Sequence, residues 1–98
     1  MHLPDSIDRA LTAAFGSAPT RAWSVGGGMI NESARVEVGG ASYFVKWKAS
    51  APPNLFAAEA RGLALLRATD TFRIPQVIAH AEPTGDTPAY LILEWLET

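Results

Sequence analysis

An apolar stripe with helical spacing lies near the start of the chain. Its members follow one another at intervals of three and four residues, which is typical of one face of an amphipathic helix. Asp5 is suited to cap the start of this helix, and Gly16 is suited to end it. The pattern therefore predicts a helix over 5–15. The stripe consists of Ile7, Ala10, Leu11, Ala14 and Phe15.

Strand-like patterns follow this helix. Residues 21–25 and 33–38 favour strands, and the glycine pair at 39–40 is typical of a hairpin turn into a third strand over 41–48. Because successive residues of a strand point to opposite sides, the third strand presents two different faces. One face holds Tyr43, Val45 and Trp47, and the other holds Phe44, Lys46 and Lys48.

The second half of the chain predicts one helix and two more strands. Consecutive prolines in the loop at 50–54 cannot join a strand ladder, and Asn54 is suited to cap a helix over 55–68. A short strand is expected over 76–81, and a nearly continuous apolar strand, typical of a buried position, over 89–96. Hairpin-linked strands with one long helix between the third and the fourth predict an α+β fold with an antiparallel five-stranded sheet.

Composition narrows the class of protein. A chain of 98 residues suffices for one modest core and no second domain. A net charge of −2 argues against a strongly basic nucleic-acid binder or a polybasic membrane-surface protein, and no apolar run approaches the ~20 residues of a membrane helix. The absence of cysteine excludes disulfides and thiolate metal sites. With no secretory leader either, a cytoplasmic protein that binds neither nucleic acid nor membrane is expected.

Three features are suited to bind a ligand, and each alone has a simpler explanation. The glycines at 26–28 offer N–H groups to a phosphate, but they match neither a P-loop nor a dinucleotide motif, and an ordinary turn explains them at least as well. Lys46 either extends to solvent or holds an anion in a cleft. Glu94 ends an apolar strand where backbone groups are free to meet a planar heterocycle, although a polar strand end explains it too.

Glu59 lies on the apolar stripe of the predicted long helix, three residues after Phe56 and four before Leu63. An unpaired carboxylate is costly to bury, so Glu59 needs a cation or several donors at this place. Lys46, on the preceding strand, is the natural partner. The alternative is that the stripe, which continues to Leu66, is partly exposed and that Glu59 lies at its rim.

The remaining polar and aromatic residues predict no chemistry. His2 and His80 lack partners at metal-ligand spacing, and Trp23 and Trp47 are expected in the core. No Ser-His-Asp set, no pair of acid/base carboxylates and no metal cluster can be assembled from this sequence. Accordingly, no catalytic residue and no metal ligand is predicted among these residues.

The order of the features is more informative than any one of them. A glycine loop between the first two strands, a lysine on the third, a glutamate on the next helix and an apolar fifth strand ending in a glutamate resemble the N-terminal lobe of protein-kinase-like enzymes. Within that superfamily the chain is similar to the fructosamine kinase (ketosamine-3-kinase) family. The matching segments are GGGMINES at 26–33, YFVKW at 43–47, FAAEARGLALL at 56–66, RIPQVI at 73–78 and LILEWLE at 91–97.

This resemblance implies a site for ATP. Lys46 would bind the α- and β-phosphates and pair with Glu59, while the glycine loop would line the phosphates. Leu93 would occupy the gatekeeper position, and the Glu94 carbonyl and the Leu96 N–H would bind the adenine edge. Phe44 would pack over the adenine. The full set implied to contact the nucleotide is Gly27, Gly28, Met29, Ile30, Asn31, Phe44, Lys46, Glu59, Glu94, Trp95 and Leu96.

Two departures from the family pattern limit what these residues are expected to do. Met29 stands where many relatives have cysteine, so thiol-based regulation of the glycine loop is not expected. The family's catalytic aspartate, in an H-G-D-type loop, and its Mg²⁺-binding D-P segment belong to a C-terminal lobe that is absent from residues 1–98. That lobe would hold the Mg²⁺ that accompanies ATP. The 98 residues alone are therefore expected to be inactive and to bind ATP weakly at best.

The expected function follows from the resemblance. Residues 1–98 would be the nucleotide-binding lobe of an enzyme that phosphorylates the sugar 3-hydroxyl of ketosamines, the adducts of glycation, and so brings about protein deglycation. One alternative is the lobe of an aminoglycoside-phosphotransferase-like kinase, which only the acceptor pocket of the C-terminal lobe would distinguish. The other is a truncated, non-catalytic interaction module whose exposed apolar underside binds a partner or a second copy of the fragment.

Overall fold

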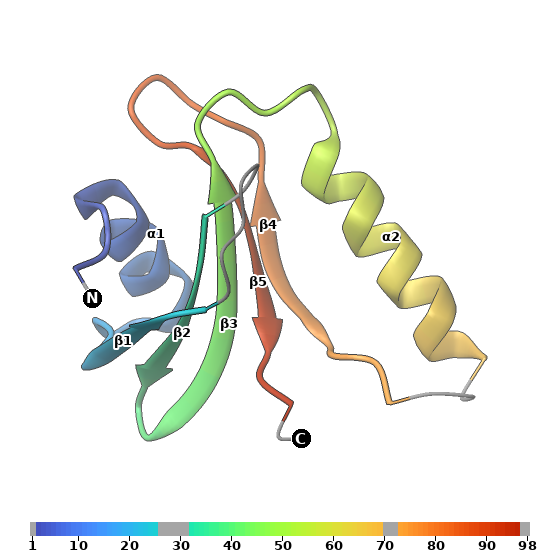
Figure 1. The fold of residues 1–98 in the computed structure, drawn as a ribbon, viewed down its shortest axis with the longest axis horizontal. Coiled ribbons are helices and arrows are strands. Elements are labelled where there is room, and N and C mark those ends of the chain that lie inside the picture. The colour runs from blue at the N-terminus through green and yellow to red at the C-terminus, as the bar shows by residue number, and fades with distance from the viewer. Residues whose placement is uncertain (1, 26–31, 70–72, 97–98) are drawn as a thin grey trace.

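One antiparallel sheet and two helices make up the described part of the chain, which comprises residues 2–25, 32–69 and 73–96 of a computed structural model (Figure 1). The order of elements is the predicted one, a helix, three strands, a helix and two strands. The elements are α1 (Asp5–Phe15), β1 (Arg21–Ser24), β2 (Glu32–Val38), β3 (Ala41–Lys48), α2 (Leu55–Ala68), β4 (Val77–Ala81) and β5 (Ala89–Glu94).

The five strands lie in the order β1-β2-β3-β5-β4, and every neighbouring pair is antiparallel. Gly39 and Gly40, with φ of 59° and 82°, form the turn of the β2–β3 hairpin, a backbone conformation that glycine adopts without strain. Strand β5 lies between β3 and β4, so it is paired on both sides. The predicted α+β fold with a five-stranded antiparallel sheet is therefore confirmed.

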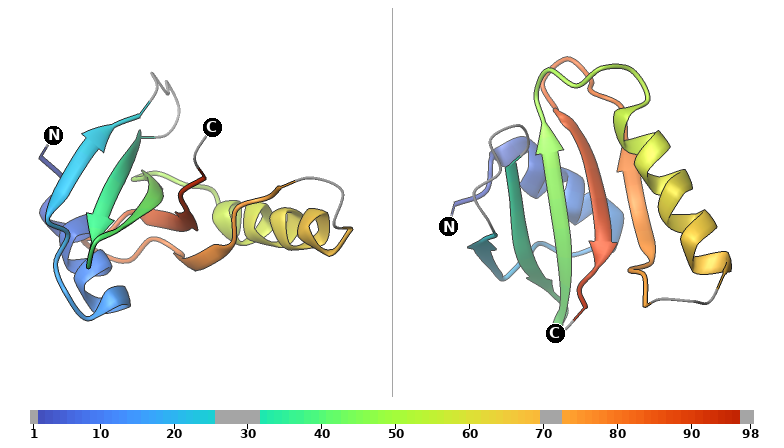
Figure 2. Two further views of the ribbon diagram at one scale, coloured as in Figure 1. Left: turned by 90° about the horizontal axis from the view of Figure 1, so that it is seen from below. Right: turned by 45° about the vertical axis from the view of Figure 1, so that its right-hand side comes forward.

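The two helices lie on opposite faces of the sheet (Figure 2). Each is held there by its own cluster of buried side chains. Strand β5 contributes to both clusters because its side chains alternate between the faces. Its Ile92 packs in the α1 cluster, and its Leu91 and Leu93 pack in the α2 cluster. The α1 cluster consists of Leu3, Ile7, Leu11, Ala34, Val36, Val38, Val45, Trp47 and Ile92, and the α2 cluster of Phe56, Ala60, Ala89, Leu91 and Leu93.

Both helices have the predicted bounds, but the predicted side-chain caps are wrong. Pro4 precedes α1 and Asp5 is its first helical residue, with no side-chain cap bond. Asn54 adopts φ 63° without a side-chain cap, and its N–H donates instead to Glu82 Oε1 at 3.0 Å. The predicted end of α1 is confirmed, because Gly16 is left-handed with φ 77°. Within the described ranges, neither helix is long and apolar enough to cross a membrane.

Several strand ends differ by one or two residues from the predicted ones. Strand β1 ends at Ser24 instead of residue 25, and β2 begins at Glu32 instead of residue 33. Strand β4 begins at Val77 instead of residue 76, because the N–H of Gln76 donates to the side chain of Glu94 instead of a backbone carbonyl.

The end of β5 differs most. This strand ends at Glu94, whereas the apolar pattern predicts a strand to residue 96. Its last pair with β3 is Tyr43–Glu94. Trp95, the next residue, packs beside the ring of Phe44 and under the guanidinium of Arg35. The apolar character of Trp95 therefore reflects packing beyond the strand.

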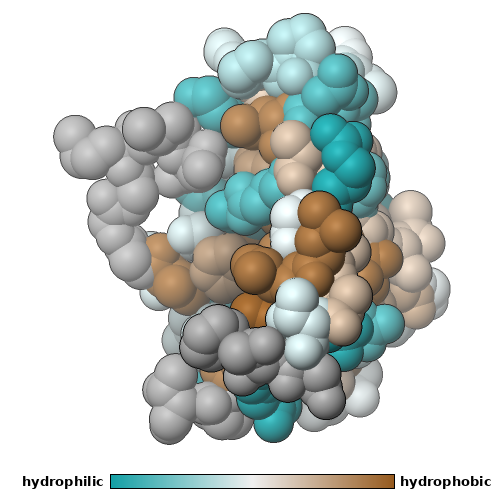
Figure 3. All heavy atoms as spheres, turned by 90° about the vertical axis from the view of Figure 1, so that its right-hand side faces the viewer, coloured by the Kyte–Doolittle hydropathy of each residue, from teal (hydrophilic) through white to brown (hydrophobic). Residues whose placement is uncertain are grey.

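One open question of burial is settled and one prediction of burial is wrong. The apolar stripe of α2 is partly exposed, which was the alternative considered for Glu59, since 47% of Leu66 is exposed and its neighbour Leu65 is still more exposed. Figure 3 shows apolar side chains on the surface of the side of the molecule where α2 lies. Trp23 is half-buried instead of lying in the core, because the guanidinium groups of Arg21 and Arg35 stack on its indole. Trp47, in contrast, is buried as predicted.

Replacement of Gly16 by alanine tests the left-handed end of α1. The N–H of Gly16 donates to the Thr12 carbonyl at 2.8 Å, and a Cβ at φ 77° is strained. We expect Gly16→Ala to lower the free energy of unfolding by ~1 kcal/mol. Gly62 is the matched control, because it lies within α2 with open space around its Cα. Gly62→Ala should raise the stability by roughly 0.5–1 kcal/mol in urea unfolding. Equal effects of the two changes would contradict the assignment.

Candidate functional site

Six of the eleven residues predicted to contact a nucleotide lie in the described part of the chain, and the other five, at 27–31, lie outside the described residues. The six come from three elements that the fold brings close together. Phe44 and Lys46 are on β3, Glu59 is on α2, and Glu94, Trp95 and Leu96 are the end of β5 and the residues directly after it.

An ion pair between Lys46 and Glu59 joins β3 to α2. Lys46 Nζ lies 2.5 Å from Glu59 Oε2, and 20% and 34% of the two side chains are exposed. Phe56, one turn before Glu59, is buried, and its ring centroid lies 5.9 Å from Nζ. Glu59 thus lies near the rim of the helix packing, but with Lys46 as its partner. The pair fixes the ammonium group at the margin of the core, where a ligand can still reach it.

Strands β1 and β2 are tied together beside Lys46. Ser33 lies directly opposite Lys46 in the register of β2 and β3. The Ser33 hydroxyl donates to the Val25 carbonyl at 2.8 Å, and the Val25 N–H donates to the Ser33 carbonyl at 3.3 Å. Residues 25 and 33, which flank the predicted phosphate-binding segment on either side, are therefore bonded to each other, and residue 33 is the cross-strand neighbour of Lys46.

The end of β5 is fixed to the residue that precedes β4. The Glu94 N–H donates to the Gln76 carbonyl at 2.8 Å, and the Gln76 N–H donates back to Glu94 Oε1 at 3.2 Å. Directly after it, the ring of Trp95 lies 6.4 Å from that of Phe44 at an interplanar angle of 31°. Since Phe44 and Lys46 are two residues apart on one strand, both side chains lie on the same face. Two aromatic rings and a paired ammonium group therefore share one side of the sheet.

Nearly the whole chain, residues 3–98, matches the family model described as fructosamine kinase. The chain belongs to the fructosamine kinase family. A relative named "Probable ketoamine kinase" from Synechocystis sp. is 43% identical over 74 residues, which are 76% of this chain and 24% of that protein. The chloroplastic protein-ribulosamine 3-kinase of Arabidopsis thaliana is 36% identical over 88 residues, 89% of this chain and 26% of the relative. The chain thus spans about a quarter of the length of these relatives.

Solved structures show the fold of this fructosamine kinase family member. A candidate fructosamine-3-kinase from Haemophilus somnus superposes with a TM-score of 0.74 at 27% identity, covering 95% of this chain and 32% of that one. An aminoglycoside phosphotransferase crystallised with AMP-PNP and hygromycin B has a TM-score of 0.64 at 21% identity, over 92% of this chain and 29% of that one. The second likeness concerns the fold alone. Both place the fold in the protein-kinase-like group, as predicted.

Two residues near the candidate site of this fructosamine kinase family member were missed by sequence reasoning. Arg35 stacks on the indole of Trp95, and Gln76 holds both the backbone and the side chain of Glu94. The sequence did contain a signal for Arg35. It stands between the apolar residues Ala34 and Val36, so in an alternating strand it points away from them, and in the register of the sheet it lies opposite Phe44. No such signal marks Gln76, whose role depends on the pairing of β4 with β5.

Metal-binding side chains do not cluster within the described residues. Residues 2–25, 32–69 and 73–96 contain no group of three His, Cys, Asp or Glu side chains that could hold a metal ion. His2 lies 3.9 Å from Asp5 on the surface at the start of α1, and His80 is exposed on β4.

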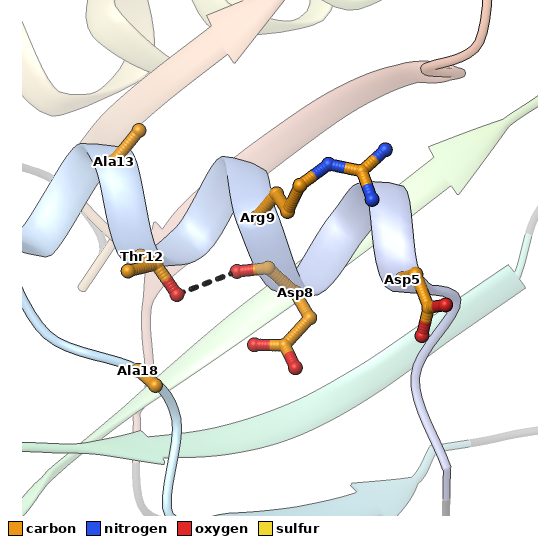
Figure 4. A pocket seen from close by; sticks show the side chains of 6 residues that line it. All are labelled: Asp5, Asp8, Arg9, Thr12, Ala13 and Ala18. Carbon is orange, nitrogen blue, oxygen red and sulfur yellow. Dashed lines mark hydrogen bonds between the residues drawn. The ribbon is translucent and has the colours of Figure 1, made fainter.

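A surface pocket of about 610 Å³ beside α1 lies away from this site (Figure 4). Helix α1 packs on the sheet face opposite to Phe44 and Lys46. Asp5 and Asp8 belong to the first turn of α1, where carboxylates favour the positive end of the helix dipole, so a structural role explains them. The pocket is lined by Asp5, Asp8, Arg9, Thr12, Ala13 and Ala18.

Proposed function

We propose that this chain is the ATP-binding, N-terminal lobe of a cytoplasmic fructosamine or ketosamine kinase, and that the catalytic lobe lies outside residues 1–98. The Lys46–Glu59 ion pair, in a chain of this family, is the observation that supports the proposal most directly. A lysine held by a helix glutamate is what a kinase lobe needs to position the phosphates of ATP. The aromatic pair of Phe44 and Trp95 on the same side adds a surface for the adenine.

Each described residue of the site has a physical role in this proposal. The Lys46 ammonium attracts the α- and β-phosphate oxygens, and Glu59 prevents the long lysine side chain from sampling other rotamers. The Glu94 carbonyl and the Leu96 N–H bind the adenine edge, while the two bonds to Gln76 fix the backbone direction at Glu94. Residues 27–31, which lie outside the described residues, are proposed to line the phosphates.

The proposed reaction moves the γ-phosphoryl group of ATP to the 3-hydroxyl of a ketosamine. The bond between the γ-phosphorus and the bridging oxygen breaks, and ADP leaves with that oxygen. A new bond joins the phosphorus to the sugar oxygen, whose proton passes to a base on the catalytic lobe. Bound Mg²⁺ supplies neutralisation of the phosphate charge. The 3-phosphate adduct is unstable, so the outcome is deglycation.

Equilibrium titration of the 98-residue chain with ATP tests the lobe assignment. We expect saturable but weak binding, with a dissociation constant on the order of a millimolar, because half of the cleft lies outside these residues. Coupled-enzyme assay for ADP in the presence of a ketoamine should show no turnover by the chain alone. Absence of saturation in the millimolar range, or turnover by the 98 residues, would each contradict the proposal.

The identity of the acceptor is tested in a longer protein that contains both residues 1–98 and the catalytic lobe. A lysine ketoamine should then be phosphorylated at the 3-hydroxyl, and an aminoglycoside should not. The reverse preference would favour the aminoglycoside-phosphotransferase alternative. If the longer protein transfers phosphate to neither acceptor and the 98-residue chain forms a dimer in light scattering, the interaction-module alternative takes the place of this proposal.

A further inference from the structure

Arg35 lies in the middle of β2, on the sheet face that holds Phe44 and Lys46. Its strand neighbours Ala34 and Val36 are fully buried on the other face. In the register of the sheet, Arg35 lies opposite Trp23 of β1 and opposite Phe44 of β3. The guanidinium group therefore extends over the face on which the nucleotide is proposed to bind.

The guanidinium of Arg35 is held between two indoles. Its central carbon lies 5.0 Å from the ring centroid of Trp23 and 4.9 Å from that of Trp95. Nε and Nη2 both donate to the Ser42 hydroxyl oxygen, at 3.1 and 3.0 Å. A planar guanidinium is suited to such a place because it stacks on aromatic faces while it donates hydrogen bonds in its own plane.

Trp95 is the only residue between Glu94 and Leu96, whose backbone groups are proposed to bind adenine. It follows the last residue pair of β3 and β5, so the sheet ladder no longer fixes it. On one side Glu94 is tied to Gln76. On the other side the indole of Trp95 lies against Arg35 and beside Phe44. The segment is thus anchored toward β4 by Glu94 and toward β2 by Trp95.

We propose that Arg35 is a positioning residue for the adenine contact, acting through the indole of Trp95. The inference rests on the proposed function, since it concerns the same nucleotide site. By fixing Trp95, Arg35 holds the Glu94 carbonyl and the Leu96 N–H in the orientation that the adenine edge requires. Binding then avoids the entropic cost of ordering this segment. The phosphates, which Lys46 binds, do not depend on Arg35.

Replacement by lysine provides the test, because Arg35→Lys keeps the positive charge and loses the planar stack. We expect the affinity of the chain for ATP to fall about three- to tenfold, as loss of one or two cation–π contacts implies. The affinity for inorganic triphosphate, which lacks the adenine, should stay unchanged. Arg21→Lys is the matched control, since Arg21 stacks on Trp23 at 4.7 Å, and it should leave both affinities unchanged.

A second measurement does not need nucleotide binding. The indole nitrogen of Trp95 is buried and has no hydrogen-bond partner within the described ranges. Arg35→Lys should speed hydrogen exchange at this indole N–H, which NMR identifies by its loss in Trp95→Phe, and Arg21→Lys should not. If the unmodified chain binds neither ATP nor triphosphate, the proposed function fails, while the exchange result still reports on Trp95.

Three results would overturn the inference. Equal losses of ATP and triphosphate affinity in Arg35→Lys would mean that Arg35 acts on the phosphates or on the whole fold. Unchanged affinity for both ligands would mean that it does not position the adenine contact. Unchanged exchange at the Trp95 indole would mean that the guanidinium does not fix Trp95.

Discussion

Lys46→Met is expected to weaken ATP binding by the chain tenfold or more, since a hydrogen bond to a charged group contributes roughly 1.5–3 kcal/mol. Glu59 holds the Lys46 ammonium at the edge of the cluster that packs α2 on the sheet. Lys48→Met is the matched control, because Lys48 lies on the same face of β3 two residues further along. It should change the affinity less than about twofold, within the range of a screened surface charge. Calorimetric titration measures both.

Glu59→Gln completes this test. It leaves the side chain nearly unchanged in shape and removes the charge that holds Lys46. We expect a loss of affinity in the same direction as that of Lys46→Met but smaller, and little additional loss in the double variant, as for coupled neighbours. The free energy of unfolding should change by less than ~1 kcal/mol, because the pair is partly exposed. Equal effects of Glu59→Gln and Lys48→Met would mean that the ion pair is only a surface contact.

Phe56→Ala should be the most destabilising of the changes considered. Only 2% of Phe56 is exposed, and its ring packs in the cluster that joins α2 to the sheet. Loss of such a ring costs ~3–5 kcal/mol, which is a large part of the ~5–15 kcal/mol that stabilises a domain of this size. Because Phe56 lies one turn before Glu59, its loss should also release the ion pair and lower ATP affinity.

Leu66→Ala is the matched control on the same helix, with 47% of the leucine exposed. Its effect on the free energy of unfolding should stay below about 1 kcal/mol. Urea unfolding of the two variants under identical conditions provides the comparison. Similar losses for Phe56→Ala and Leu66→Ala would contradict the packing of α2 through its N-terminal half.

Local patterns predicted much of this fold because they agree with its long-range packing. The apolar stripe that includes Ile7 and Leu11 defines α1, and both residues are buried against the sheet. The alternation in β3 separates Val45 from Lys46 onto opposite faces, as observed. In these segments the residues that the hydrophobic period predicts to face inward are the ones that lie in the core.

The errors arise where a contact distant in sequence determines the outcome. Asn54 does not cap α2 through its side chain: it adopts φ 63° instead of the extended conformation of such a cap, and its N–H donates to Glu82, 28 residues away. Trp95 belongs to no strand, because Arg35 and Phe44 provide its packing. No periodicity within one segment contains such information.

The candidate site was predictable to the same extent. The pairing of Lys46 with Glu59 followed from a carboxylate on an apolar stripe and a lysine on the preceding strand. The roles of Arg35 and Gln76 required the register of all four strand pairs. The assignments at 27–31 stay predictions, since those residues lie outside the described part of the chain.

Backbone-amide NMR of the chain during titration with AMP-PNP and Mg²⁺ tests whether ATP binds on the face of Phe44 and Lys46. We expect saturable shifts at Phe44, Lys46, Glu59 and Leu96, and no comparable shifts in the α1 pocket around Asp8 and Thr12. Lys46→Met should abolish these shifts at the same nucleotide concentration, and Lys48→Met should preserve them. Saturable shifts confined to α1, or none near Lys46 and Leu96, would contradict the assignment of this face as the ATP site.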